Sequence, residues 1–119
     1  LGIDLIEVDR IRRSIQSAHF CERVFGAQER QQLAARSMAA ESAAACFAAK
    51  EAFGKALGCG VRGFSLAEVQ LLREPSGRPY LSLCGRALLL AEERGLEFAV
   101  SVTHTKQYAA VVVAAEKKA

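Results

Sequence analysis

The segment Glu41–Gly58 constrains the fold more than any other part of the chain. Its sequence, ESAAACFAAKEAFGKALG, is rich in alanine, contains no proline, and ends on a glycine suited to a helix C-terminus. At about 100° per residue, a helix here is apolar nearly all round, which predicts a buried helix. The charged residues Glu51 and Lys55, one turn apart on this helix, therefore need a specific explanation.

The rest of the chain predicts short strands and shorter helices around this buried helix. Alternation or apolar runs favour strands at Leu1–Ile6, Val69–Arg73, Tyr80–Leu83, Phe98–Thr103 and Ala110–Ala115. Helical periods or helix-favouring composition follow Val8 and cover Ala27–Arg36, which we expect to be exposed, and Gly85–Arg94. Pro75-Ser76-Gly77 predicts a hairpin turn. The pattern predicts a single domain over residues 1–119 of the α+β class, with a mostly antiparallel sheet packed against the long buried helix.

Composition and charge narrow the function classes. The 119 residues carry a formal net charge of +3 with dispersed basic residues, whereas nucleic-acid binders concentrate theirs on one face. The longest apolar runs, Ala43–Ala49 and Tyr108–Ala115, fall far short of the ~20 residues of a membrane helix. Four cysteines without a C-x-x-C pair predict reduced thiols and a cytoplasmic chain. The first residue is Leu, so we expect a few residues to precede it.

Two carboxylates from separate elements are candidate metal ligands. Asp4 lies in a predicted strand, where aspartate is unfavourable, although an exposed edge strand would tolerate it. Glu51 and Lys55 also fit an ordinary surface ion pair, but the helix that carries them lacks a broad polar face. Mg²⁺ binds one or two carboxylates and completes its shell with water and phosphates, so Asp4 and Glu51 suit it. Lys55 would then neutralise a phosphate oxygen.

Two further motifs carry weaker signals. Gly58-Cys59-Gly60, followed by Arg62, could bring backbone N–H groups near a phosphate, although a simple helix end explains the glycines better. His104, between Thr103 and Thr105, could contact a phosphate or could be structural. No G-x-S-x-G motif is present to support a serine hydrolase.

Taken together, three blocks resemble a known family. GIDLIEVDRI at Gly2–Ile11, FAAKEAFGKALGCG at Phe47–Gly60 and SVTHTKQYAA at Ser101–Ala110 match the holo-acyl-carrier-protein synthases, the short trimeric class of 4′-phosphopantetheinyl transferases. SGRPYL at Ser76–Leu81 fits the hairpin of that family. The order and spacing of the blocks agree over essentially the whole chain.

The resemblance implies a role for each matching residue. Asp4 and Glu51 are the implied Mg²⁺ ligands, with Glu51 and Lys55 catalytic. The implied coenzyme A contacts are Lys55, Gly58, Gly60, Pro79 and Thr103, with Lys50, Arg62 and His104 as weaker candidates for contacts to its phosphates. The implied carrier-binding residues are Arg10, Arg13, Phe20 and Arg23, whereas we expect Arg12 to lie on a solvated helix face.

The resemblance also implies a reaction and partners. A serine of an apo acyl carrier protein would attack coenzyme A and receive the 4′-phosphopantetheine group, with release of 3′,5′-adenosine bisphosphate, in fatty acid biosynthesis. The implied assembly is a homotrimer with sites between subunits. Two alternatives stay open on the residues alone. One is a non-catalytic coenzyme A or nucleotide-binding module, and the other is a single-strand-binding domain, for which the strands offer few aromatics.

Overall fold

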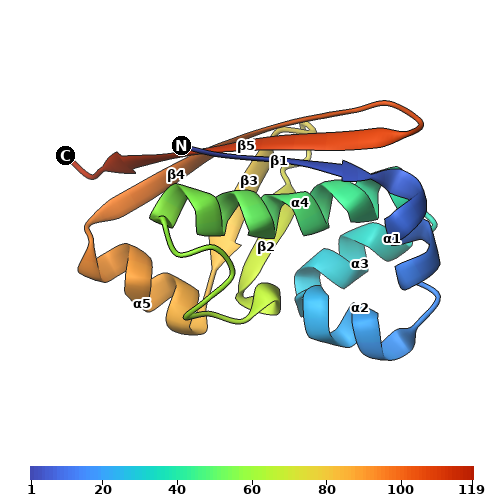
Figure 1. The fold of residues 1–119 in the computed structure, drawn as a ribbon, viewed down its shortest axis with the longest axis horizontal. Helices are drawn as coiled ribbons and strands as arrows, with labels where there is room; N and C mark the ends of the chain where they lie inside the picture. Colours follow the sequence, from blue (N-terminus) through green and yellow to red (C-terminus); the bar gives the residue numbers. More distant parts are fainter.

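A long central helix, α4 (Ala40–Leu57), runs through the middle of the molecule. The computed structural model describes all residues from Leu1 to Ala119. The shorter helices are α1 (Val8–Ser14), α2 (Ala18–Val24), α3 (Ala27–Ala35) and α5 (Gly85–Glu93). Figure 1 shows α1, α2 and α3 grouped near the start of α4, α5 near its end, and a sheet along one side.

That sheet has three antiparallel strands, β1 (Gly2–Glu7), β4 (Leu96–His104) and β5 (Tyr108–Lys117), with β5 in the centre. Asp4 of β1 pairs with Val111 of β5, which pairs with Val102 of β4. Side chains alternate between the two faces of a strand. In β1, the face with Asp4 and Ile6 therefore packs towards α4, and the other face is exposed.

Gly2 allows β1 and α4 to approach each other closely. A Cβ atom at Gly2 would lie only 1.9 Å from the carbonyl oxygen of Ala52, so a larger residue would displace the strand from the helix. Ala52 is itself fully buried. Because Asp4 follows on the same face of β1, this close approach holds its carboxylate next to α4.

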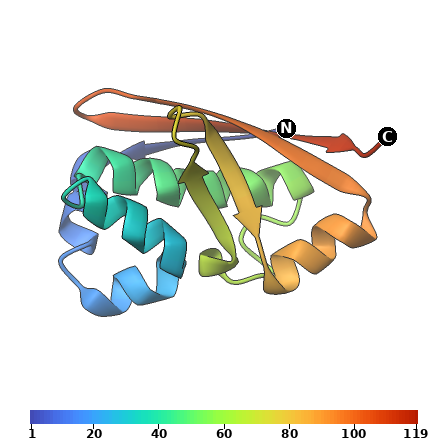
Figure 2. The ribbon, with the colours of Figure 1, turned by 180° about the vertical axis from the view of Figure 1, so that it is seen from behind.

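A second, two-stranded sheet consists of β2 (Val69–Arg73) and β3 (Pro79–Leu83), and a short 3₁₀ turn, Leu66–Glu68, precedes it. Figure 2 shows this hairpin crossing α4, with α5 beside it. The predicted turn at Pro75-Ser76-Gly77 is confirmed, and Gly77 adopts the positive φ of 93° that glycine tolerates best.

The core is built mainly around α4, and the predicted buried helix is confirmed. Alanines fill most of its surface, namely Ala43, Ala44, Ala45, Ala48, Ala49 and Ala52. Phe53 supplies bulk, because its ring packs against Phe64 at 5.3 Å and Phe98 at 4.9 Å between centroids. Gly58 ends the helix in the left-handed conformation. No helix combines the length and hydrophobicity that crossing a lipid bilayer requires.

The expectation of an exposed helix at Ala27–Arg36 is wrong in part. Helix α3 forms there, but Glu29 is fully buried and Leu33 is 3% exposed. Glu29 accepts hydrogen bonds from the backbone of Gly26 and of Leu71 in β2. The helix therefore packs against the hairpin through a glutamate, which a purely hydrophobic pattern does not predict.

Candidate active site

Asp4 and Lys55 form the centre of the site. The Nζ atom of Lys55 lies 3.2 Å from Oδ1 of Asp4 and donates to the carbonyl oxygen of Ile3 at 3.0 Å. The Asp4 side chain is only 16% exposed, whereas that of Lys55 is 53% exposed. Lys55 thus bridges α4 to β1 while its cationic end remains accessible to a ligand.

Glu51 lies one turn before Lys55 on α4 and is half-buried. Burial raises the pKa of Glu51 above the usual value of a glutamate, and the nearby charge of Asp4 raises it further. The positive charges of Lys55 and Arg10 oppose this rise. The two carboxylates therefore lie close enough to repel each other, and Glu51 is partly buried.

This pair of carboxylates fits a divalent cation. Two like charges in a partly buried site repel, and a cation between them removes the repulsion. The chain has no cluster of three or more His, Cys, Asp or Glu side chains, so an all-protein coordination shell is absent. Mg²⁺ needs only one or two carboxylates beside water and phosphate oxygens, which Asp4 and Glu51 can supply. The structure therefore brings together both sequence-predicted metal ligands and Lys55.

Arg10 and Phe20 extend this cluster towards α1 and α2. The Arg10 guanidinium lies 5.6 Å from the ring centroid of Phe47, and Phe20 stacks on the same ring at 6.2 Å. Phe47 lies one turn before Glu51 on α4. Phe47 is 8% exposed and packs in the core, but its ring also contacts both Arg10 and Phe20 beside the carboxylates. The i, i+4 spacing of Phe47 and Glu51 was the available signal.

The remaining arginines of this surface differ in their contacts. Arg13 and Arg23 are exposed and form no ion pair. Arg12 contacts Asp9 and lies 3.7 Å from Glu41, so its charge is already neutralised. The expectation that Arg12 belongs to a solvated helix face agrees with its exposure and local pairing.

The glycine-rich turn ends α4 and uses its own N–H groups to do so. The N–H groups of Cys59 and Gly60 both donate to the carbonyl oxygen of Gly54 at 3.1 Å, and that of Gly58 donates to Lys55. These groups are therefore not free to bind phosphate in this conformation, and the interpretation as a helix end describes them better. Arg62 is exposed beside the turn.

Thr103 and His104 lie far from this glycine turn within one chain. They end β4, and Figure 1 shows the β4–β5 turn near the start of α4, whereas Gly58–Gly60 follow its end. Pro79 begins β3 on the separate hairpin. A single chain therefore brings together Asp4, Glu51 and Lys55 but not all the predicted coenzyme A contacts.

Lys50, a weaker candidate for a phosphate contact, is enclosed in a buried ion pair. Its side chain is fully buried and its Nζ lies 2.7 Å from Oε1 of Glu29. A phosphate cannot reach an ammonium group enclosed in this way. Sequence analysis missed the partner because Glu29 lies 21 residues away, in a helix expected to be exposed.

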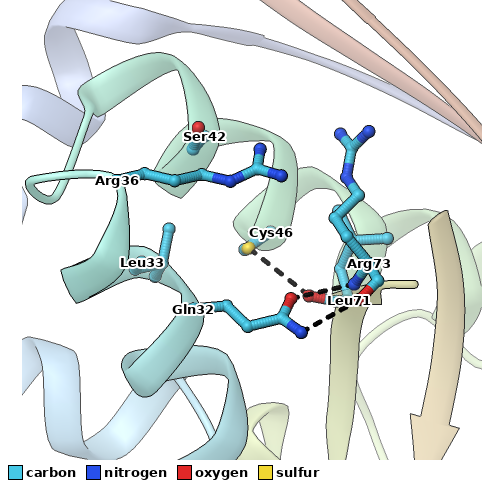
Figure 3. A pocket seen from close by; sticks show the side chains of 7 residues that line it. All are labelled: Gln32, Leu33, Arg36, Ser42, Cys46, Leu71 and Arg73. Carbon is cyan, nitrogen blue, oxygen red and sulfur yellow. Dashed lines mark hydrogen bonds between the residues drawn. The ribbon is translucent and has the colours of Figure 1, made fainter. Parts of the chain in front are cut away.

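A small pocket lies on the side of α4 away from Asp4 and Glu51, and Figure 3 shows its lining residues. Its lining comes from α3, α4 and β2 and consists of Gln32, Leu33, Arg36, Ser42, Cys46, Leu71 and Arg73. Burial and the charge of Arg36 lower the pKa of Arg73, and burial raises the pKa of Cys46, which keeps it a neutral thiol. Glu51 lies nine positions after Ser42, which is about 180° around a helix, so this basic pocket faces away from the carboxylates.

Comparison with known proteins identifies the family of the chain. A family model described as the 4′-phosphopantetheinyl transferase superfamily matches residues 1–113. The chain belongs to this superfamily. Within it, a holo-[acyl-carrier-protein] synthase of Treponema denticola is 44% identical over 118 residues, which cover 98% of this chain and 96% of the relative. The family prediction is thereby confirmed.

Solved structures of the 4′-phosphopantetheinyl transferase superfamily share the fold. The holo-[acyl-carrier-protein] synthase of Neisseria meningitidis matches with a TM-score of 0.89 at 28% identity, covering 98% of this chain and 96% of that one. A synthase from Bacillus anthracis in complex with CoA (3′,5′-ADP) matches with a TM-score of 0.82 at 29% identity, covering 98% and 95%. The predicted α+β fold class is confirmed.

Proposed function

We propose that this chain transfers the 4′-phosphopantetheine group of coenzyme A to a serine of an apo acyl carrier protein. The observation that carries the proposal is the cluster of Asp4, Glu51 and Lys55 in a chain of the 4′-phosphopantetheinyl transferase superfamily. Relatives named holo-[acyl-carrier-protein] synthase, one of them solved with coenzyme A, support the substrates. We assign the activity to fatty acid biosynthesis in the cytoplasm, with which four free cysteines are compatible.

Asp4, Glu51 and Lys55 have different roles in the proposed reaction. Asp4 and Glu51 would hold Mg²⁺, which neutralises charge on the pyrophosphate of coenzyme A. Lys55 presents a partly exposed ammonium beside them, positioned to contact a phosphate oxygen of the leaving 3′,5′-adenosine bisphosphate. Glu51 is our candidate for accepting the proton of the carrier serine as its oxygen attacks the β-phosphorus. A water held by the cation and oriented by Glu51 is the alternative base.

A mass measurement tests this function directly. Purified protein, coenzyme A, Mg²⁺ and an apo acyl carrier protein are mixed, and the carrier is analysed by intact-mass spectrometry. The expected result is a gain of one phosphopantetheine on the carrier, absent when the carrier serine is replaced by alanine. A carrier that stays in its apo form while coenzyme A binds would instead favour a non-catalytic binding module.

We also propose that three copies assemble with sites between subunits. The outer face of β1 exposes Leu1, Ile3 and Leu5, at 87%, 61% and 65%, and Val112 of β5 continues this apolar face. Exposed apolar surface of this kind is typical of an interface. Assembly would also help to explain why the predicted coenzyme A contacts are dispersed over a single chain.

The variant Leu5→Lys is expected to dissociate the assembly, because it places a charge in the centre of the apolar face. Analytical ultracentrifugation should show wild-type protein at three chain masses and the variant at the 12.8 kDa of one chain. Gln31→Lys, on the exposed side of α3, is the matched control and should keep the wild-type mass. A Leu5→Lys variant that sediments as wild type would contradict the proposed interface.

The surface around Phe47 is our candidate for carrier binding. Arg10, Arg13 and Arg23 provide positive charge, and Phe20 provides apolar area stacked on Phe47. Acyl carrier proteins are expected to be acidic, so this charge would mainly speed the encounter and weaken with salt. The surface adjoins Glu51, so a docked carrier would present its serine near the candidate base.

Replacing Arg10 by glutamate is expected to raise the KM for the carrier about tenfold, which corresponds to a loss of ~1.4 kcal/mol. The affinity for coenzyme A, measured by calorimetry without carrier, should change little. Arg30→Glu, which makes the same charge change on an exposed residue of α3, should leave both values near wild type. An equal loss for carrier and coenzyme A would reject the docking role of Arg10.

A further inference from the structure

A buried ion pair lies immediately behind the candidate active site. Lys50 and Glu29 are both fully buried, and Nζ of Lys50 lies 2.7 Å from Oε1 of Glu29. The same Nζ donates to the backbone carbonyl of Val69 in β2. Lys50 directly precedes Glu51 on α4, so whatever holds Lys50 also affects the direction in which Glu51 points.

Both oxygens of the Glu29 carboxylate accept hydrogen bonds. Its Oε1 accepts from the N–H of Gly26 at 3.1 Å as well as from Lys50, and its Oε2 accepts from the N–H of Leu71 at 2.8 Å. No buried side-chain nitrogen or oxygen of the chain lacks a partner. The network therefore joins three elements, α3, α4 and β2, by short directional bonds.

Stability alone does not account for such a pair. Taking two charges out of water carries a large desolvation cost, and apolar residues of similar volume often stabilise a fold as well or better. What a buried polar network adds is direction, because hydrogen bonds form only at particular angles and distances. The pair is therefore best suited to fixing the orientation of α4 relative to β2.

The packing of α4 by itself does little to fix the rotation of this helix about its axis. Its buried surface is mostly alanine, and the methyl groups of Ala44, Ala45, Ala48 and Ala49 form only shallow ridges. Shallow ridges resist rotation of a helix about its axis less than large interlocking side chains do. A side-chain oxygen about 6 Å from the axis moves about 1 Å when the helix rolls by about 10°.

A shift of this size matters for a metal site. Mg²⁺ requires oxygen ligands at about 2.0–2.1 Å in nearly ideal octahedral geometry. We propose that Lys50 and Glu29 are positioning residues that set the roll of α4 and so hold the Glu51 carboxylate at the distance from Asp4 that a divalent cation needs. This inference rests on the proposed function of Asp4 and Glu51 as ligands.

The test measures metal affinity without turnover. Mn²⁺, which takes similar oxygen ligands and is paramagnetic, is titrated into the protein and followed by electron paramagnetic resonance. The variant Lys50→Met/Glu29→Gln removes both charges and leaves a carboxamide that can bond to Leu71 and Val69. We expect its Mn²⁺ affinity to fall about tenfold or more, in line with the loss of residues that orient metal ligands.

Two further variants separate positioning from general destabilisation. Leu33→Ala removes a buried side chain of α3 without touching the ion pair, so it should lower Tm yet leave the Mn²⁺ affinity at the wild-type value. Glu29→Asp keeps the charge but retracts the carboxylate by one methylene, and we expect an intermediate loss of Mn²⁺ affinity. The Mn²⁺ affinity of Glu29→Asp also tests the positioning role if the double variant does not fold.

The outcomes are distinct. Wild-type Mn²⁺ affinity in both Lys50→Met/Glu29→Gln and Glu29→Asp would overturn the inference while leaving the metal site intact. An equal loss in Leu33→Ala would also overturn it, since destabilisation alone would then be sufficient. If wild type and Glu51→Gln bind Mn²⁺ equally, the proposed metal site itself fails, and the positioning role fails with it.

Discussion

Glu51→Gln is expected to lower kcat by about a thousandfold, within the range for loss of a general base, while coenzyme A still binds. The change removes the charge of one of the two carboxylates near Lys55, and it removes the candidate base at the same time. Turnover is measured as modified carrier by mass spectrometry, and coenzyme A binding is measured by calorimetry. Loss of turnover with retained binding identifies a catalytic rather than a binding role.

Glu93→Gln is the matched control, because it makes the same change on an exposed residue of α5. Its kcat should equal that of the wild type. Wild-type turnover by Glu51→Gln would contradict the assignment of this residue. Full turnover of the wild-type protein in excess chelator would contradict the metal dependence, since Asp4 and Glu51 would then have no cation to hold.

Lys55→Met is expected to lower kcat about a hundredfold, as for removal of one group that stabilises developing charge. The ammonium of Lys55 lies 3.2 Å from Asp4 and lowers the pKa of Glu51. Its removal therefore raises the pKa of Glu51 further. If Glu51 acts as an ionised carboxylate, the acidic limb of the pH–rate profile must move to higher pH in the variant.

Two controls accompany Lys55→Met. Lys55→Arg keeps the positive charge, so its acidic limb should stay near that of wild type even if kcat falls. Lys118→Met, at the exposed end of the chain, should leave both kcat and the profile unchanged. An acidic limb of Lys55→Met that stays in place or moves to lower pH would rule out the proposed coupling between Lys55 and Glu51.

Much of the fold was predictable because it depends on local patterns. The alanine-rich run with its closing glycine indicated α4 within a residue at each end, alternation indicated β1 and β4, and an apolar run indicated β5. The turn residues around Gly77 indicated the hairpin. The candidate site was predictable in the same way, since Asp4, Glu51 and Lys55 lie in short motifs that match a known family.

Three features escaped prediction because they depend on contacts between distant segments. The buried partner of Lys50 is Glu29, which lies in a helix of polar composition expected to be exposed. The N–H groups of Cys59 and Gly60 are already bonded to the carbonyl oxygen of Gly54, which sequence spacing does not show. The apolar side of β1 faces outwards, because the side with Asp4 is the one packed on α4.

The sequence by itself determined which segments become helices and strands, and which acidic and basic residues were candidates for chemistry. Periodicity and turn residues act within a few positions, so they can be recognised without knowing the fold. Only the tertiary structure decided which charges meet: Asp4 with Lys55 across 51 residues, and Glu29 with Lys50 across 21. Those pairings depend on the path of the whole chain. They leave Lys55 partly exposed in the candidate site, whereas Lys50 is fully buried.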